Sequence, residues 1–483
     1  MKKIKKIKKI LAAVLLVALL IPLFPKKAEA TVYPSGAIAV GIDVSIYQGD
    51  VDWNQVKNAG ISFAMIKAYE SGYGVDKKFV QNITGAAAAG LRTGVYVFSK
   101  ARTVEEAYLE ATTVVNLVAP YQVSFPIAID LESKVMDGLS KDQIAAIANT
   151  FCAVIDAYGY TPIIYANKNW FKNRIGNVNY DRWVAMYADR CDYAIDPQMW
   201  QASSTFHVAG IKGNVDLDYL YKDYSYIVPN GFSTKGDGYV YLYKNYRYQR
   251  GWVDYAGLKF FCDAYGHLQT GWLVGAGTDK WYLGPDGYMR TGLQAIDGAI
   301  YYFGDDGLCK YGFQNIAGNT YYFDAVGRLV TNAFVPDANG GIHYFQADGS
   351  MAKGFAAANG SVYYFNNDGL MQVGLQKIGA QLYYFNGYGQ MQTGWQSFPD
   401  GNKYFFDPAN GTLYKGLLAD VDGFRYCDPT DGHMVTGFVS LYGATFCFDP
   451  VTGLLWTNRI IPTETGSWGI DAAGVCTFYP GVF

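Results

Sequence analysis

Histidine is scarce in this chain of 483 residues, and that scarcity excludes several kinds of catalytic site. Only four histidines are present, and His207 is the only one in the first half of the chain. A Ser-His-Asp triad requires a histidine beside a nucleophile, and the sequence offers His207 no evident partner of that kind. Zinc sites require clustered cysteine and histidine ligands, which the chain also lacks. We therefore expect neither a catalytic triad of this type nor a bound metal.

Cysteine is sparse as well. Seven cysteines occur, at positions 152, 191, 262, 309, 427, 447 and 476, without paired Cys-x-x-Cys spacing. A secreted disulfide framework would be denser and would usually hold an even number of cysteines. We interpret most of them as small apolar residues of the core. The chain also lacks a P-loop and a G-x-G-x-x-G segment after a strand, so no cofactor is expected.

No long apolar run follows the first 30 residues. Six lysines lie among the first nine residues, an apolar run covers 10–24, and Ala-Glu-Ala ends at Ala30. These are the three parts of a secretory signal peptide, which we place at 1–30. The run is short for a membrane span of ~20 residues, so an uncleaved anchor is the weaker alternative. We expect a secreted chain without a membrane contact after cleavage.

Positive charge is concentrated in that same segment. Residues 1–30 carry eight lysines and Glu29, so their removal changes the formal net charge from −3 to −10. An acidic mature protein is poorly suited to the phosphate backbone of DNA or RNA, and we exclude nucleic acid as a partner.

What the sequence does contain falls into two halves, and the first, residues 37–222, alternates apolar runs with helix patterns. The runs lie at 37–43, 63–68, 94–98, 127–131, 162–166 and 183–187. N-cap signals precede several helix patterns, namely Asp52, the pair Thr103 and Glu106, and the pair Ser140 and Gln143. Repeated βα units predict a parallel sheet covered by helices, in a compact barrel or a doubly wound sheet.

Residues 223–240 are expected to be a linker, and residues 241–483 form a repeat array. Aromatic triplets begin at Trp281, Tyr301, Tyr321, His343, Tyr363, Tyr383 and Tyr404. A glycine before an apolar residue recurs at 251, 271, 292, 312, 354, 374, 394, 416 and 437, and Asn332 fills the gap. The period is 20 to 22 residues.

Each repeat predicts a β-hairpin. In residues 382–395 we expect an aromatic strand, a turn at Asn386-Gly387 and a second strand that ends in Gly394-Trp395. One hairpin alone is marginally stable, but stacked hairpins can bury aromatic rings between neighbours as a β-hairpin solenoid. Most of the aromatic residues are therefore explained by packing between repeats, without a ligand.

The chemistry of the first half is concentrated in "FPIAIDLES", residues 125–133. Asp130 and Glu132 alternate after an apolar run, so both side chains face the same way, ~6–7 Å apart at their Cα atoms. Catalytic sites of parallel α/β folds lie at the carboxyl ends of strands. Repulsion and partial burial would keep one carboxyl protonated while the other stays ionised, which suits glycoside hydrolysis. A solvated strand end or a metal site is the alternative.

Other carboxylates could join this pair. Asp43 ends the first apolar run, and Asp216 and Asp218 alternate in "GNVDLDYLY". In a barrel, the ends of different strands converge on one mouth, so Asp43 could meet Asp130 and Glu132.

Eight segments of residues 41–221 resemble glycoside hydrolase family 25, the lysozymes of the N,O-diacetylmuramidase type. They are "GIDVSIYQGDVDW", "VKNAGISFAMIKAYES", "GLRTGVYVF", "PIAIDLE", "PIIYAN", "RWVAMYA", "MWQASS" and "GNVDLDYL", in the family's order. The resemblance implies an α/β fold with an irregular (β/α), TIM-like barrel. It also implies cleavage of the β-1,4 bond from N-acetylmuramic acid to N-acetylglucosamine in peptidoglycan.

The resemblance also implies roles for residues. The family's general acid falls on Glu132, and its two nearby aspartates fall on Asp130 and Asp43. A further carboxylate falls on Asp216, with Asp218 as the second choice. The positions that line the groove fall on Tyr96, Tyr165 and Gln201. 

Two departures from the family pattern stand out. Val97 replaces a histidine of many members, and Lys67-Ala68-Tyr69-Glu70 replaces Lys-Ala-Thr-Glu. We expect neither to touch the carboxylates. Asp130 could attack the sugar itself or could orient the substrate's N-acetyl group as the nucleophile, and we favour the second route.

The second half resembles the cell-wall/choline-binding repeats and the related repeats of clostridial toxins and glucan-binding proteins. In choline binders, tryptophans form a cation–π cage for a quaternary ammonium. The matching positions here include Trp272, Trp281 and Trp395, while Tyr, Phe or Leu stands elsewhere. We therefore favour a wall polysaccharide or teichoic acid as the ligand, with choline second.

Three functions compete. A secreted, cell-wall-associated peptidoglycan hydrolase is favoured, because the carboxylate set is intact. A non-catalytic wall- or glycan-binding adhesin or toxin-like protein with an inactive barrel is the alternative. A hydrolase of the same fold that acts on another polysaccharide is the third.

Overall fold

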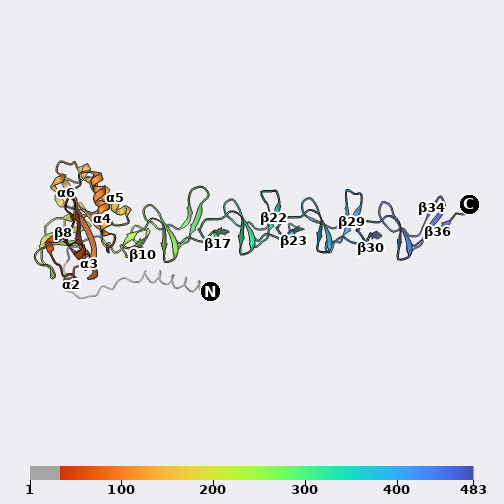
Figure 1. Ribbon diagram of the computed structural model, residues 1–483, viewed down its shortest axis with the longest axis horizontal. Helices are drawn as coiled ribbons and strands as arrows, with labels where there is room; N and C mark the ends of the chain where they lie inside the picture. Colours follow the sequence, from red (N-terminus) through yellow and green to blue (C-terminus); the bar gives the residue numbers. More distant parts are fainter. Residues whose placement is uncertain (1–32, 482–483) are drawn as a thin grey trace. The chain divides into compact units, whose positions relative to one another are not determined.

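The computed structural model describes residues 33–481, so the expected signal peptide lies outside the described residues. Contacts divide the chain into two units, Met1–Leu273 with Leu283–Met289, and Val274–Tyr282 with Arg290–Phe483. The first holds all the helices among the described residues, and the second consists of β-hairpins (Figure 1). No helix among residues 33–481 is both long and apolar enough to cross a membrane.

A closed barrel of eight strands forms the body of the first unit. The strands are β1 (Ala39–Val44), β2 (Phe63–Glu70), β4 (Arg92–Phe98), β5 (Ile127–Asp130), β6 (Pro162–Asn167), β7 (Asp181–Ala185), β8 (Met199–Phe206) and β9 (Val215–Leu220). Their order is β1-β9-β8-β7-β6-β5-β4-β2, β1 pairs with β2 to close the ring, and β3 (Gly74–Val75) extends β2. The α/β prediction is confirmed, and the barrel is the form that the sheet takes.

One strand makes the barrel irregular. Neighbouring strands from β1 through β8 run parallel, but β9 is antiparallel to both β8 and β1. The first residues of β9 therefore lie at the same mouth as the last residues of the other strands. This reversal pairs Asp43 at the end of β1 with Asp216 near the start of β9.

Helices cover the outside of the barrel. They are α2 (Trp53–Asn58), α3 (Phe79–Ala88), α4 (Val104–Val118), α5 (Lys141–Ala157) and α6 (Lys168–Asn173), with 3-10 turns η1 (Ile46–Gln48), η2 (Lys134–Met136) and η3 (Tyr193–Ile195). Asp52 caps α2, and the capping box of α5 is present, as predicted. Thr103 caps α4, but Glu106 accepts from the Arg102 amide and not from the cap residue.

Two apolar clusters fill the first unit. One packs alternate strand residues against the helices, as with Ile129 and Phe151. The other contains the intervening residues, such as Phe63 and Trp183, which therefore face the barrel interior. This inner cluster continues into Tyr224, Tyr226, Ile227, Tyr241, Tyr243 and Tyr248. The start of the segment that we expected to be a linker is thus part of the barrel's core.

Replacing Tyr224 with alanine is expected to destabilise the first unit by about 3–4 kcal/mol, as for other buried aromatic side chains. Tyr224 is 0% exposed, stacks edge-on against Phe125 at 5.3 Å and donates to Asp181 at 2.8 Å. Chemical denaturation followed by tryptophan fluorescence measures the change. A loss below about 1 kcal/mol would fit a flexible linker instead.

The array consists of successive two- and three-stranded hairpins. Its strands from β10 to β22 are β10 (Asn230–Thr234), β11 (Val240–Lys244), β12 (Arg247–Tyr248), β13 (Gly251–Tyr255), β14 (Leu258–Cys262), β15 (Gly271–Val274), β16 (Lys280–Leu283), β17 (Gly292–Ile296), β18 (Ala299–Phe303), β19 (Gly312–Ile316), β20 (Asn319–Phe323), β21 (Ala333–Pro336) and β22 (Ile342–Phe345). The others are β23 (Gly354–Ala358), β24 (Ser361–Phe365), β25 (Gly374–Ile378), β26 (Gln381–Phe385), β27 (Met391–Gln392), β28 (Gly394–Ser397), β29 (Lys403–Phe406), β30 (Gly416–Asp420), β31 (Gly423–Cys427), β32 (Gly437–Leu441), β33 (Ala444–Phe448), β34 (Arg459–Thr463), β35 (Gly466–Ile470) and β36 (Cys476–Pro480).

The hairpins begin at a different point of the repeat than we predicted. The strand that opens with glycine comes first and pairs with the aromatic strand that follows it, as β25 pairs with β26. Several of the turns between these strands have positive φ at both central residues, for example Asn359 (49°) and Gly360 (76°) between β23 and β24, which suits a tight hairpin. Asn386 accepts the amides of Tyr388 and Gln390 in the loop after β26, and β26 also pairs across this loop with the short strand β27, so the predicted pairing is present in part. Gly394 opens the next hairpin.

Other sequence predictions for the array are confirmed. Asn332 has φ of 49°, so it adopts the left-handed conformation that glycine adopts in most repeats.

All seven cysteines are free and buried, as expected for small apolar core residues.

Candidate active site

Five carboxylates gather at one mouth of the barrel. Asp43 and Asp130 end strands β1 and β5, Glu132 lies two residues beyond β5, and Asp216 and Asp218 lie in β9. The charges of Asp216 and Asp218 act on Asp43, and the charge of Asp216 also acts on Glu132. The structure thus brings together all the carboxylates that the sequence singled out.

Gln201 on β8 fixes the position of Asp43. Its Nε2 donates to Asp43 Oδ2 at 2.7 Å, and its Oε1 accepts from Tyr165 at 2.9 Å and from Tyr187 at 3.1 Å. Because both hydroxyls donate to the same oxygen, the amide must present its NH₂ group to Asp43. Gln201 therefore favours an ionised, correctly oriented Asp43 carboxylate.

Asp216 and Asp218 differ in access. Asp218 is 0% exposed and accepts from the Trp183 indole at 2.8 Å, and its buried Oδ2 has no hydrogen-bond partner within the part of the chain that the structure describes. Asp216 is only partly buried and faces Asp43 across the β1–β9 pair. Of the two, Asp216 is the one that a substrate can reach.

Burial dominates the electrostatics of this cluster. It raises the pKa of Asp43 well above its ordinary value, and the charges of Asp218 and Asp216 raise it further. Burial also raises the pKa of Asp218, while the Trp183 indole opposes that change. The three aspartates cannot all be ionised without strong repulsion, so protons are shared among them near neutral pH.

Replacing Asp218 with asparagine is expected to stabilise the protein at neutral pH, because a neutral amide avoids the cost of ionising a carboxyl whose pKa burial raises. A carboxyl whose pKa is raised by folding binds its proton more tightly in the folded state. Its contribution is favourable at low pH and is lost as pH rises through the folded-state pKa. Melting temperatures of the two proteins should therefore converge in acid and separate near pH 7. A variant that is less stable at every pH would contradict this account.

Glu132 is half-buried and held by a neighbour. Burial raises its pKa, the Asn167 side chain lowers it by a hydrogen bond, and the charge of Asp216 raises it. Asn167 caps helix α6 by accepting the Trp170 amide with its Oδ1, so its NH₂ group is the part that can face Glu132. Glu132 thus has a raised pKa and is partly exposed, and it does not belong to the cluster of three aspartates.

Asp130 is buried, and its Oδ1 lacks a hydrogen-bond partner among the described residues. Burial raises its pKa, the charge of Glu132 raises it further and the charge of Lys67 lowers it. Lys67 contacts Glu70 at 2.5 Å, and Lys100 contacts the same carboxylate at 2.9 Å. The 67–70 segment therefore acts on Asp130 through charge, since Lys67 lowers its pKa, and it makes no direct hydrogen bond or ion pair with Asp130 among the described residues.

Aromatic side chains line the interior below the mouth. The Tyr165 ring lies 4.5 Å from Trp183, and the Tyr96 ring lies 6.1 Å from it, both edge-on. The exposed Tyr187 reaches Gln201 from the end of β7. Sequence reasoning missed Trp183, Tyr187 and the Asn167 contact, although alternation along 183–187 would have placed Trp183 and Tyr187 on one face.

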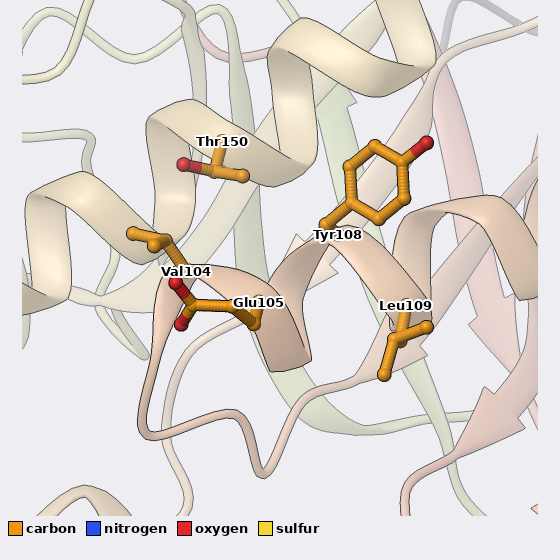
Figure 2. Close-up of a pocket in the computed structure, with 5 residues that line it drawn as sticks. All are labelled: Val104, Glu105, Tyr108, Leu109 and Thr150. Carbon is orange, nitrogen blue, oxygen red and sulfur yellow. The ribbon is translucent and has the colours of Figure 1, made fainter.

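One hollow on the first unit lies away from this mouth. It has a volume of about 470 Å³ on helices α4 and α5 (Figure 2) and is lined by Val104, Glu105, Tyr108, Leu109 and Thr150. It holds one carboxylate and none of the predicted site residues. The hollow therefore lacks the paired carboxylates that gather at the barrel mouth.

In the array, the predicted tryptophans have different surroundings. Trp272 lies in β15 and is 37% exposed, Trp281 lies in β16, and Trp395 in β28 donates its indole N–H to Asp420 at 3.2 Å.

Asp428, Asp431 and His433 place ligand atoms within 4.8 Å of one another in a surface turn. Hydrogen bonds within that turn account for these side chains.

Comparison with known proteins identifies the first half. Residues 42–211 match the glycosyl hydrolases family 25. Lysozyme M1 of Streptomyces globisporus is 30% identical over 207 residues, which cover 39% of this chain and 70% of that protein. The chain belongs to glycosyl hydrolases family 25. It is a glycosidase, and the predicted resemblance is confirmed.

Two further proteins are similar to the first half of the chain. The autolytic lysozyme of Clostridium acetobutylicum is 30% identical over 181 residues, covering 37% of this chain and 54% of that protein. A solved family 25 glycosyl hydrolase from Bacillus anthracis is 25% identical, with a TM-score of 0.36, covering 40% of this chain and 92% of the other.

The second half matches repeat families. Residues 310–353 and 372–417 match a choline-binding repeat, and residues 353–371 match a putative cell wall binding repeat. The family 25 glycosidase therefore carries repeats of a wall-binding type, as the sequence predicted.

Proposed function

We propose that the protein is a secreted lysozyme that cleaves the β-1,4 bond between N-acetylmuramic acid and N-acetylglucosamine in peptidoglycan. In this proposal residues 37–222 are the catalytic domain, and the repeats of 241–483 hold the enzyme on the cell wall. The observation that carries it is the pairing of Glu132, whose pKa is raised, with the buried Asp130 at the mouth of a family 25 barrel.

Glu132 acts as the general acid. A glycosidic oxygen must be protonated as its bond breaks, and the acid must hold its proton near the working pH. Partial burial supplies the raised pKa of Glu132, and partial exposure gives the substrate access to it.

Asp130 orients the substrate. Its unpaired Oδ1 can accept a hydrogen bond from the N–H of the substrate's N-acetyl group, which would stabilise that group as it attacks the anomeric carbon. Asp43, set by Gln201, and Asp216 add negative charge that stabilises the developing oxocarbenium ion. Tyr96, Tyr165 and Gln201 line the groove that positions the sugar.

The hairpins of the array stack as a solenoid and present repeated weak sites. Main-chain bonds join each connecting segment to the preceding hairpin, as from Leu329 to Ile300 and from Met371 to Ile342, both 2.8 Å. Trp272 and Trp281 are the proposed stacking residues for a wall polysaccharide or teichoic acid, with choline as the alternative ligand. Several weak contacts on one polymer would raise the affinity through avidity.

Clearing of purified cell walls tests the proposal. The full chain is expected to sediment with walls and to lower their turbidity. Walls that are bound but never cleared would instead identify a non-catalytic adhesin.

Replacing Asn167 with serine is expected to shift the alkaline limb of the activity profile to higher pH. Serine can still cap α6, but it removes the amide that lowers the pKa of Glu132. The acid is active while protonated, so activity is lost as pH rises through its pKa, and a higher pKa delays that loss. A pH profile of kcat/KM on soluble glycan fragments measures the shift, and a shift to lower pH would contradict the role of Asn167.

A further inference from the structure

In the hairpins of the second unit, one position of the second strand holds Tyr, His, Phe or Trp in every repeat except one. The position is on the second strand of each hairpin, directly opposite the third residue of the first strand. We call it the stacking position. It is held by Tyr301, Tyr321, His343, Tyr363, Tyr383, Tyr404, Arg425, Phe446 and Trp468. Arg425 is the exception.

In several repeats the second residue of the preceding hairpin is aromatic, and the ring at the stacking position packs against that residue. Tyr383 lies 5.0 Å from Phe355, and Tyr363 lies 4.9 Å from Phe334. The other wall of the Phe355 site is its cross-strand partner Tyr364, also at 5.0 Å. Each such inter-repeat site therefore has two walls from one hairpin and a third from the next.

At Trp395 the third wall is a cation. Phe405 supplies the cross-strand wall, 5.2 Å from Trp395, and the Arg425 guanidinium lies 5.7 Å from the centre of the Trp395 ring. A guanidinium at that distance from an indole face makes a cation–π contact. The chain itself thus supplies the kind of group that an aromatic cage would otherwise take from a ligand.

Arg425 is held firmly in this place. It is 9% exposed, donates to Asp420 Oδ2 at 2.7 Å and donates through Nε to the Thr452 carbonyl at 2.9 Å. The same Asp420 oxygen accepts the Trp395 indole at 3.2 Å. A ligand that displaced the guanidinium would leave Asp420 and Arg425 without these bonds, which is costly for groups that are largely buried.

We propose that Arg425 is a built-in cation that closes the Trp395 site to cationic ligands, so that the sites along the array are not equivalent. A quaternary ammonium would meet a like charge on an indole face that is already engaged. Arg425 is therefore a specificity-determining residue, and Trp395 stabilises the junction between two hairpins. This deepens the proposed wall-binding role of the repeats, although it can be tested without walls or catalysis.

Replacing Arg425 with tyrosine, the commonest residue at the stacking position, should open the site. Equilibrium dialysis with labelled choline chloride counts the bound ligand on the full-length protein. The R425Y protein is expected to bind one more equivalent than the unmodified protein. The double variant R425Y/W395A should lose that extra equivalent, and W395A alone should bind as much as the unmodified protein.

Arg328→Tyr is the matched control, because Arg328 is a surface residue paired with Asp324 and lies outside the stacking position. It should leave the choline count unchanged. If R425Y does not fold, Arg425→Gln removes the charge and keeps most of the length, and it too should gain an equivalent. No gain in either variant, or a loss of choline binding in W395A alone, would overturn the proposal whether or not the protein cleaves peptidoglycan.

Discussion

Replacing Glu132 with glutamine is expected to slow wall hydrolysis by about 10³-fold, the typical contribution of a positioned general acid. Glutamine keeps the shape of the side chain and its contact with Asn167, but it has no proton to donate to the leaving oxygen. Turbidity loss of purified walls measures the rate, and sedimentation with walls measures binding. Binding should be unchanged, because the repeats are untouched.

The matched control is Glu105→Gln on the outer face of α4, where the side chain lines the hollow of Figure 2, away from the mouth. That variant should lyse walls as fast as the unmodified enzyme. If the Glu132 variant retained lysis, the acid would have to be another carboxyl, and Asp216 would be the first to test.

Replacing Asp130 with asparagine is expected to slow hydrolysis by about 10²-fold, since a charge that steadies the reacting group in the transition state is lost. The effect should fall mainly on kcat, because the side chain keeps its size within the buried strand end. Kinetics on soluble glycan fragments separate kcat from KM.

Azide added to the Asp130→Ala protein distinguishes the two roles of Asp130. If Asp130 were the nucleophile, its removal would leave room for azide to attack and give a glycosyl azide of inverted configuration. Substrate assistance predicts no such product, because the N-acetyl group already occupies that face. Detection of the azide product by mass spectrometry would contradict the orienting role.

Most strands of the barrel could be predicted from the sequence, and those that could not were missed for physical reasons. Six of the eight barrel strands are apolar runs between helix signals, so their hydrophobicity revealed them. Strands β8 (MWQASSTF) and β9 (VDLDYL) contain polar residues at the mouth. They therefore lack the continuous apolar run that would have predicted a strand. The reversal of β9, which brings Asp216 to Asp43, depends on sheet pairing and is invisible in local patterns.

The sequence predicted the carboxylates of the site and a groove position for Gln201, but it did not predict the contacts that hold the carboxylates. Alternation after an apolar run identified Asp130 and Glu132, because that pattern is local. Gln201 meets Asp43 across 158 positions of the chain, and Lys67 acts on Asp130 through space. Such contacts exist only once the barrel has closed.

The array shows the same division. The period and the tight turns follow from the spacing of glycine and aromatic residues. Each aromatic strand has a turn on either side, however, and the sequence does not show across which turn it pairs. The loop at Asn386-Gly387 does join two antiparallel strands, β26 and β27, but the longer pairing of β26 is with β25 before it, and Gly394 belongs to the next hairpin. Arg425 and Trp395 lie in adjacent hairpins, so their contact required the stacked structure.

Identification of the new reducing ends released from purified walls tests the central claim most directly. Digested fragments can be reduced with borohydride and analysed by mass spectrometry. The account predicts reduced N-acetylmuramic acid at the fragment ends, absent from the Glu132→Gln digest. Reduced N-acetylglucosamine, or fragments of a different wall polysaccharide, would contradict it.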